Sequence, residues 1–234
     1  MTDSGEKTYS APGHAGLTVL RATVGRWLGS RYDLHQHGTE HVPADGPVIF
    51  AANHSGWLDG PLLIACTPRP AHALVKAEQF EGRSGALLRL AGQISVRRDE
   101  NDAAAVRKAV AALEAQHAVA VFPEGTRGAG DVAHVKDGMA YLALVTGAPV
   151  VPVAIFGTRQ AGQPGDAKPD KGARIELFYG RPIAVERRPW PRARGEVRTL
   201  AGRLQQELRV HVEKSAEVSE VALPGPLPPG DTHV

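Results

Sequence analysis

Two residues of the chain have the types and the spacing of a general base with its orienting partner. His54 and Asp59 lie five positions apart between two apolar runs. A neutral imidazole removes a proton from a hydroxyl only when its tautomer and orientation are fixed, and a carboxylate bonded to the other ring nitrogen fixes both. Such a base has no nucleophile of its own, so we expect the substrate to supply it.

The elements on either side place this pair on a loop. Val48–Ala52, behind the turn signal Gly46-Pro47, is a short apolar run of the kind that forms a buried strand. Asp59 precedes Gly60-Pro61 and a second apolar run, a pattern typical of a helix N-cap with proline in the first turn. His54 would then lie on a strand-to-helix loop. Alternatively, His54 only forms hydrogen bonds that stabilise the loop, and Asp59 only caps the helix.

A second polar segment offers groups that bind anions. The apolar run Val119–Phe122 predicts a buried strand that leads directly into Pro123–Arg127. An arginine fork, a hydroxyl and a glycine that lets the backbone approach a ligand suit a phosphate. Lys136 would add a point charge to the site. The loop candidates are Glu124, Gly125, Thr126 and Arg127.

Arg98 is a further candidate for contact with an anion. Ile94 and Val96 alternate with polar residues, which predicts a short strand. Arg98 shares the face of Val96 at the end of that strand, where the edge of a sheet meets solvent or substrate. It is therefore either a substrate contact or a surface charge.

A histidine-rich segment could be taken for a metal site. Asp33–His37 alternates in the manner of a strand, and neither cysteines nor a second histidine pair supports a metal centre. We therefore expect no metal and no cofactor. The residues concerned are His35, His37, Glu40 and His41.

The composition is that of an ordinary soluble protein with one core. Of the 234 residues, 42% are hydrophobic and 22% are charged. A net charge of +2 and 5% aromatic residues argue against a nucleic-acid partner. Cys66 is the only cysteine, so we expect no internal disulfide and a reducing, cytoplasmic compartment. No apolar run approaches the roughly 20 residues that span a bilayer, and the N-terminal residues lack a signal-peptide core.

Two segments could bring the protein to a membrane surface. In residues 15–32, arginines at 21, 26 and 31 lie off an apolar stripe, which predicts a basic amphipathic helix. This helix either lies peripherally on the cytoplasmic face of the inner membrane or packs on the core. A cluster of arginines around Trp190 suits an anionic membrane or an acidic carrier protein, or forms a solvated loop. The stripe comprises Leu17, Leu20, Val24, Trp27 and Leu28, and the cluster Arg181, Arg187, Arg188, Arg192, Arg194 and Arg198.

The order of the predicted elements favours an α/β fold. Strands alternate with helices, so we expect a single domain with a central, mostly parallel sheet flanked by helices. This folded domain would cover residues 15–222, with the candidate motifs in 33–185 and an amphipathic C-terminal helix within 196–222. We expect residues 1–14 and 223–234, which are polar or rich in Pro and Gly, to be disordered tails.

Four of these stretches, in this order, resemble the motif blocks of the glycerolipid acyltransferase family typified by 1-acyl-sn-glycerol-3-phosphate acyltransferases. Asn53–Asp59 is similar to the NH-x4-D block, and Gly92–Arg98 to the second block, which ends in arginine. Phe122–Arg127 is similar to the third block and Pro149–Val153 to the fourth. Four blocks in order are a specific signal. The resemblance implies a glycerol-3-phosphate acyltransferase-like fold for the domain.

The resemblance also implies an activity. A fatty acyl group would move from a thioester, on coenzyme A or acyl carrier protein, to the free hydroxyl of 1-acyl-sn-glycerol 3-phosphate, which makes phosphatidic acid. His54 would take the hydroxyl proton, and Asp59 would orient and stabilise the imidazolium. Arg98 and the Glu124–Arg127 loop match positions tied to the acceptor phosphate, and Lys136 matches a basic position often found soon after the third block. Because Glu124 repels a phosphate, it would bond an acceptor hydroxyl or orient an arginine.

The sequence departs from the family pattern at two places, and other functions stay open. Gly128-Ala129-Gly130 stands where a serine is common, and residues 17–32 are shorter than the usual hydrophobic N-terminal element. The acceptor could instead be glycerol 3-phosphate, a lysophospholipid or a glycolipid. The same base could activate water in a thioester hydrolase, or the chain could be a catalytically silent lipid-binding protein that works through its first helix.

Overall fold

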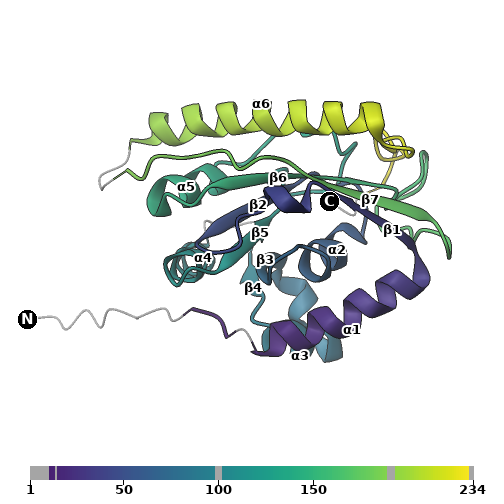
Figure 1. The fold of residues 1–234 in the computed structure, drawn as a ribbon, viewed down its shortest axis with the longest axis horizontal. Coiled ribbons are helices and arrows are strands. Elements are labelled where there is room, and N and C mark those ends of the chain that lie inside the picture. Colours follow the sequence, from purple (N-terminus) through teal and green to yellow (C-terminus); the bar gives the residue numbers. More distant parts are fainter. Residues whose placement is uncertain (1–10, 14, 98–101, 189–192, 232–234) are drawn as a thin grey trace, which may run out of the picture.

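The described part of the chain forms one sheet with helices on both faces (Figure 1). The structure, a computed structural model, describes residues 11–13, 15–97, 102–188 and 193–231. Arg98, Trp190 and Arg192 therefore lie outside the described residues, as does most of the predicted N-terminal tail.

The sheet contains seven strands in the described ranges. They are β1 (Asp33–His37), β2 (Val48–Ala52), β3 (Ala71–Lys76), β4 (Ile94–Val96), β5 (Ala118–Val121), β6 (Val150–Phe156) and β7 (Arg174–Tyr179). Their order is β1-β7-β6-β2-β5-β3-β4. Neighbouring strands run parallel except β6 and β7, which are antiparallel. This confirms the predicted α/β fold with a mostly parallel sheet.

The helices in the described ranges are α1 (Ala15–Arg31), α2 (Asp59–Ala65), α3 (Gly82–Leu90), α4 (Ala103–Glu114), α5 (Gly138–Thr146) and α6 (Arg194–Val218), with two short 3-10 helices, η1 (Thr39–His41) and η2 (Ala77–Phe80). Four of these α-helices, α2 to α5, connect strands, while α1 precedes β1 and α6 follows β7. In α6, the predicted apolar face is buried at Leu204, Leu208 and Val212. The pattern did not predict α3, because two glycines, two arginines and a serine among its nine residues weaken the apolar period.

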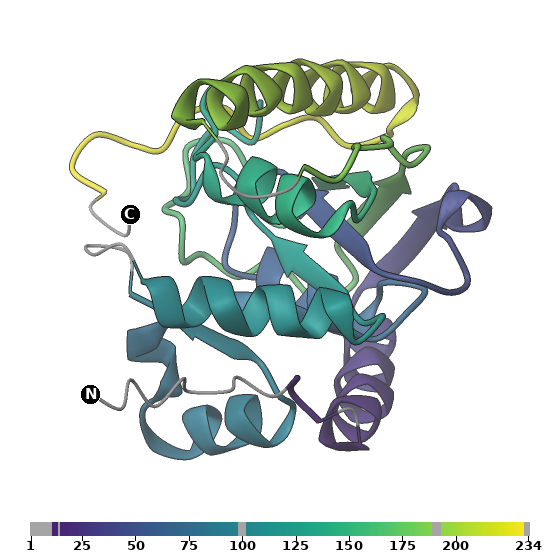
Figure 2. The same ribbon diagram turned by 90° about the vertical axis from the view of Figure 1, so that its left-hand side faces the viewer.

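The central strands divide their side chains between two cores. On β2, Ile49 and Ala51 belong to one apolar cluster, whereas Val48, Phe50 and Ala52 belong to the other. Both faces are buried, since α4, α5 and α6 cover the first and α1 and α2 the second (Figures 1 and 2). Burial on both faces explains why these strands are continuously apolar in sequence.

Helix α1 packs on the second core and is only partly the basic surface helix predicted for residues 15–32. Leu28 is fully buried, whereas Trp27 is 49% exposed. The guanidinium of Arg21 donates to the carbonyl oxygens of Thr67 and Arg69 at 2.5 and 3.1 Å. Arg21 is thus not a surface charge as expected, because the chain that leaves α2 presents carbonyls that its donors satisfy. In the part of the chain that the structure describes, no helix has the length and apolarity to cross a bilayer.

The segment expected to be a disordered C-terminal tail, 223–234, packs back on the domain over its described part. The side chain of Arg159 donates to the carbonyl oxygen of Gly225 at 2.5 Å. The N–H of Gly165 donates to the Asp231 carboxylate at 2.7 Å. Both contacts join residues 66 positions apart. Composition reports only the local preference of a segment, so it could not reveal such distant partners.

Candidate active site

The parallel strands bring the motif loops to one edge of the sheet. β2 and β5 are parallel neighbours with Ala51 opposite Val121, so the loops that follow them begin side by side. β6 is the other parallel neighbour of β2, with Ala52 opposite Val153, and it ends at the same edge. Ligands of open α/β sheets bind outside the carboxyl ends of the strands. The first and third motif blocks therefore meet where a ligand site is expected, while most of the fourth block lies inside the sheet, in the first half of β6.

His54 and Asp59 are in direct contact. His54 Nδ1 lies 2.8 Å from Asp59 Oδ2, and the same oxygen accepts the backbone N–H groups of Ser55 and Gly56 at 2.7 and 2.9 Å. Asp59 is completely buried and His54 is 6% exposed. Asp59 is not the N-cap predicted from the sequence, because Leu58 occupies that position and the carboxylate faces the preceding loop.

This contact fixes the tautomer of His54. An ionised carboxylate only accepts hydrogen bonds, so the proton is on Nδ1 and Nε2 is the basic nitrogen. The imidazole also stacks on Phe122, with ring centroids 4.0 Å apart and planes 17° from parallel. The strand-to-helix loop and the aromatic ring together hold the imidazole in one orientation, as a general base requires.

Glu124 supports the backbone of the same loop. Its Oε1 accepts the N–H of His54 at 2.8 Å. Burial raises the pKa of the Glu124 carboxyl to about 7 against the lowering effect of this hydrogen bond, and the carboxylates of Asp131 and Asp59 add to the rise. The sequence predicted an acceptor hydroxyl or an arginine as its partner. Within the protein its partner is the main chain beside the base, and the bond to an acceptor hydroxyl stays a prediction.

Gly125 and Lys136 lie against each other. Gly125 has φ 76°, and a β-carbon there would stand 2.6 Å from Cε and 3.0 Å from Nζ of Lys136. Glycine is needed both for the left-handed conformation and for the space. The N–H of Lys136 donates to the carbonyl oxygen of Pro123 at 2.8 Å, which holds the two segments together. The structure thus brings two of the predicted anion-binding residues together.

Arg127 shares a groove of about 470 Å³ with His54. Thr126 precedes it in the same half-buried loop, whereas Arg98 is outside the described residues. The walls come from α1, α2, β3, α3 and the start of the Glu124 loop, and include Leu20, Val24, Ile64, Leu74, Leu88 and Phe122. A mostly apolar groove with a histidine and an arginine on its wall suits a ligand with a long apolar part and a polar or anionic end.

Asn53 connects the end of β2 to β6. Its side-chain Oδ1 accepts the N–H of Ile155 at 2.7 Å, and Nδ2 donates to the carbonyl oxygens of Ile155 and Gly130 at 3.1 and 3.0 Å. The side chain is buried with every one of these groups satisfied. Asn53 therefore anchors the first motif from within the sheet, immediately before the candidate base.

Arg159 is a site residue that the sequence analysis did not find. It is 3% exposed. Its Nε donates to the carbonyl oxygen of Ser55 at 2.7 Å, and its guanidinium also donates to the carbonyl oxygens of Gly128 and Gly225. It thus holds the first motif loop, the segment after the third and the C-terminal segment together. The available signal was its position three residues after the buried strand β6.

The histidines near β1 contact other groups of the protein. His35 pairs with Asp33 at 2.9 Å, His37 stacks on Phe178, and His41 bonds the carbonyl oxygen of Tyr179 at 2.9 Å. Within the described ranges, no group of three or more His, Cys, Asp or Glu side chains is arranged to hold a metal ion.

A family model and curated proteins are similar to this chain. A model described as Acyltransferase matches residues 33–156. A 1-acyl-sn-glycerol-3-phosphate acyltransferase from Bacillus subtilis is 29% identical over 159 residues, which cover 67% of this chain and 76% of that protein. A lyso-ornithine lipid O-acyltransferase from Pseudomonas aeruginosa is 32% identical over 147 residues, 60% of this chain and 56% of that protein.

A solved structure is also similar. The 1-acyl-sn-glycerophosphate (LPA) acyltransferase from Thermotoga maritima superimposes with a TM-score of 0.64 at 26% identity. The match covers 85% of this chain and 79% of that one. The likeness therefore extends well beyond the segment that the family model matches.

Proposed function

This chain belongs to the acyltransferase family, and we propose that it transfers a fatty acyl group from a thioester to the free hydroxyl of 1-acyl-sn-glycerol 3-phosphate. The donor is acyl-CoA or acyl carrier protein, and the product is phosphatidic acid, a phospholipid precursor. The observation that carries this proposal is the His54–Asp59 hydrogen bond beside a groove that Arg127 also lines. The names of relatives from two bacteria support the choice of acceptor.

His54 acts as the general base in this reaction. Its Nε2 takes the proton of the acceptor hydroxyl as the hydroxyl oxygen attacks the carbonyl carbon of the thioester. The tetrahedral intermediate then expels the thiolate and forms the ester, and the imidazolium gives its proton to the departing sulfur. Asp59, held by two backbone N–H groups, stabilises the imidazolium without taking its proton.

The cationic residues of the site bind the acceptor phosphate. Arg127 offers a planar fork of donors on the wall of the groove, and Lys136 offers an ammonium group beside Gly125. Arg98, matched through the family resemblance, is proposed to contribute a third charge. The apolar walls receive the acyl chain and keep its carbonyl carbon near the imidazole.

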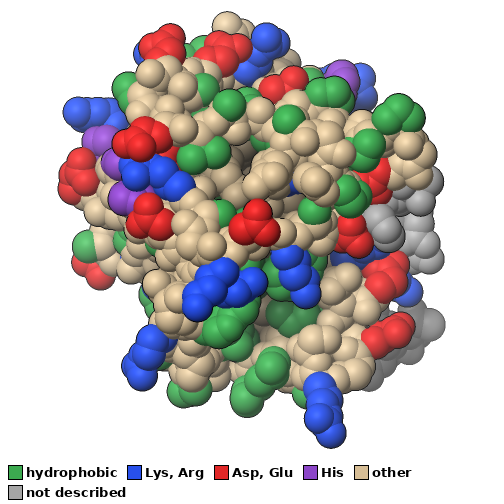
Figure 3. Space-filling view, turned by 90° about the vertical axis from the view of Figure 1, so that its right-hand side faces the viewer, with side chains coloured by type: hydrophobic (Ala, Val, Ile, Leu, Met, Phe, Trp, Pro, Cys, Tyr) green, Lys and Arg blue, Asp and Glu red, His purple; other side chains and the backbone are tan. Residues whose placement is uncertain are grey.

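The proposal includes a peripheral location at the cytoplasmic face of the inner membrane. Exposed apolar side chains occur on α1, where Val19 is 64% exposed, and on α3, where Leu87 and Leu90 are 53% and 68% exposed. The helices touch where Gly16 approaches the carbonyl of Leu90. The face in Figure 3 has a hollow with apolar walls and cationic side chains at its rim. An apolar surface with a cationic rim suits an anionic bilayer.

An assay of the purified protein with an acyl thioester and a panel of acceptors tests the activity. We expect transfer to 1-acyl-sn-glycerol 3-phosphate and its loss in His54→Ala, with the fold retained by circular dichroism. Transfer only to acceptors that lack a phosphate would contradict the roles of Arg127 and Lys136.

A different acceptor is a second candidate because a relative is named for lyso-ornithine lipid. The same panel separates it, along with glycerol 3-phosphate, other lysophospholipids and glycolipids. Thiol release that does not depend on any added acceptor would indicate a thioester hydrolase instead.

A further inference from the structure

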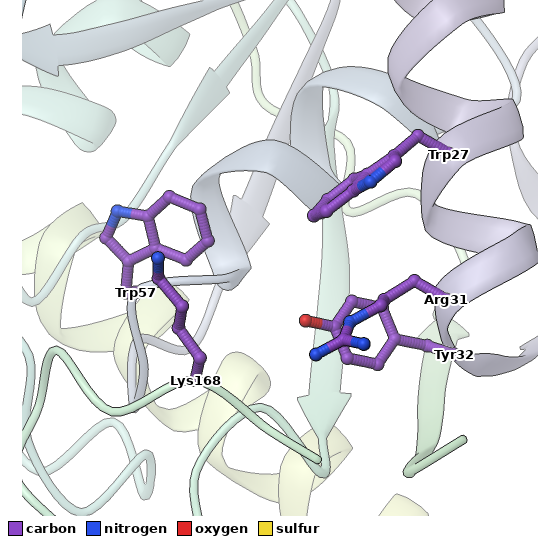
Figure 4. A pocket seen from close by; sticks show the side chains of 5 residues that line it. All are labelled: Trp27, Arg31, Tyr32, Trp57 and Lys168. Carbon is purple, nitrogen blue, oxygen red and sulfur yellow. The ribbon is translucent and has the colours of Figure 1, made fainter. Parts of the chain in front are cut away.

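A second pocket, of about 340 Å³, has walls made only of aromatic and cationic residues. Trp27, Arg31 and Tyr32 come from α1 and the residue after it, Trp57 from the first motif loop, and Lys168 from the loop between β6 and β7. Figure 4 shows the two indoles on opposite sides of an open space, with the guanidinium and the ammonium groups at its border.

The rings and charges of this pocket are held by contacts with one another. Lys168 Nζ lies 5.3 Å from the centre of the Trp57 ring, and Arg31 Cζ lies 5.9 Å from the centre of the Tyr32 ring. Trp27 stands edge-on to Tyr32 with centroids 6.2 Å apart. A backbone hydrogen bond of 2.8 Å from Gly172 to the carbonyl oxygen of Arg31 ties the Lys168 loop to the end of α1.

The chemistry of the walls selects a flat ring that carries phosphates. Two cations line the pocket and no aspartate or glutamate is among its lining residues. A lipid phosphate would use the cations but not the indoles, and a quaternary ammonium group would use the aromatic rings but be repelled by the cations. A purine nucleotide uses both, because its base stacks on indoles and its phosphates pair with Lys and Arg.

The pocket adjoins the catalytic groove, since Trp57 lines both. We propose that the pocket formed by Trp27, Arg31, Tyr32, Trp57 and Lys168 binds the adenosine bisphosphate end of an acyl-CoA donor. This inference rests on the proposed function and deepens it by selecting CoA as a carrier. The base stacks on an indole of the pocket wall, and the phosphates face Lys168 and Arg31. Trp57 separates the nucleotide from the thioester, which lies in the groove beside His54.

Two donors and four variants test this subsite. The donors carry the same acyl group, one on CoA and one on N-acetylcysteamine, which lacks the nucleotide. Lys168→Ala and Arg31→Ala should each raise the KM for acyl-CoA roughly two- to fivefold, as expected for partly exposed charge pairs, and leave the KM for the short thioester unchanged. The exposed Lys171→Ala and Arg26→Ala, from the same loop and helix, are matched controls and should change neither value.

Binding of adenosine 3′,5′-bisphosphate, followed by calorimetry, gives a readout that needs no turnover. Weaker binding in Lys168→Ala and Arg31→Ala than in both controls would support the subsite even if the protein transferred no acyl group, in which case only the proposed function fails. If the protein is active but the two variants match the controls, the subsite is wrong and the function stands. A wild-type enzyme that uses acyl carrier protein and not acyl-CoA would overturn it. A rise in the KM of the lipid acceptor alone in Lys168→Ala and Arg31→Ala would also overturn the subsite, because it would indicate a site for the lipid headgroup.

Discussion

The carboxylate of Glu124 accepts the backbone N–H of His54 at 2.8 Å. The third motif therefore supports the residue that carries the candidate base, although 70 positions separate the two in sequence. Because Glu124 is largely buried beside Asp59 and Asp131, its pKa rises from 4.5 to about 7.

This shift makes the stability of the fold depend on pH. Between pH 4.5 and about 7 the unfolded chain loses the Glu124 proton while the folded chain keeps it, so folding stability falls as pH rises. Glu124→Gln keeps an acceptor for the His54 N–H but does not ionise. We expect the variant to gain on the order of 1–3 kcal/mol relative to wild type between pH 4.5 and 8, measured by urea unfolding. The exposed Glu207→Gln is the control. An equal gain in stability in both variants would show that the raised pKa of Glu124 does not cause the effect.

Asp59→Asn should lower kcat with little change in KM. The amide can still accept one backbone N–H, but it does not stabilise an imidazolium and can present the wrong group to Nδ1. We expect kcat to fall by about 10²- to 10⁴-fold, the range of a lost general base. Steady-state kinetics with circular dichroism of the folded variant measure this. A kcat within twofold of wild type would exclude Asp59 from the mechanism.

Arg127→Ala and Lys136→Ala should weaken binding of a phosphorylated acceptor. Charge-assisted hydrogen bonds contribute about 1.5–3 kcal/mol, so we expect the acceptor KM to rise roughly ten- to hundredfold for Arg127. The rise should be smaller for Lys136, which is exposed. An acceptor without a phosphate serves as the reference substrate. If the KM of this reference acceptor rises by the same factor, Arg127 and Lys136 do not bind the phosphate.

Arg159 is predicted to be a positioning residue for the His54 loop. Arg159→Lys keeps the charge but loses the planar fork that reaches Ser55, Gly128 and Gly225 together. We expect a loss of about 1–3 kcal/mol in the free energy of unfolding and a fall in kcat that exceeds any change in acceptor KM. The exposed neighbour Gln160→Ala should match wild type in both measurements. If Arg159→Lys is destabilised but its kcat is unchanged, Arg159 stabilises the fold and does not position the base.

The exposed apolar side chains of α1 and α3 should determine binding to vesicles. Leu90→Ser, at a side chain that is 68% exposed, removes apolar contact with a bilayer without opening a cavity. We expect a several-fold loss of co-sedimentation with anionic vesicles. Val218→Ser, at a side chain on α6 that is 70% exposed, is the matched control. Equal loss in both variants would place the membrane contact elsewhere.

The sequence alone was sufficient for four of the strands, for the strand-to-helix loop that carries His54, and for the family. These features follow from short-range information, because apolar runs and turn residues fix strand ends and a motif keeps its reactive residues within a few positions. The register of β2 against β5 and β6 determines which distant residues meet the His54 loop, and no local sequence pattern contains this information. Neighbouring parallel strands place Glu124 and Arg159 against the His54 loop, 70 and about 104 positions away in sequence.

Tertiary contacts also reversed some local preferences. Arg21 points toward the protein because its guanidinium bonds carbonyl oxygens in the chain after α2. The Pro-Gly segment after residue 223 packs on the domain because Arg159 and Gly165 form hydrogen bonds with it. Sequence patterns report what a segment prefers by itself. Which polar groups lie opposite one another, and hence which ones support the base, is decided only when the strands pair and the loops at their ends share one edge.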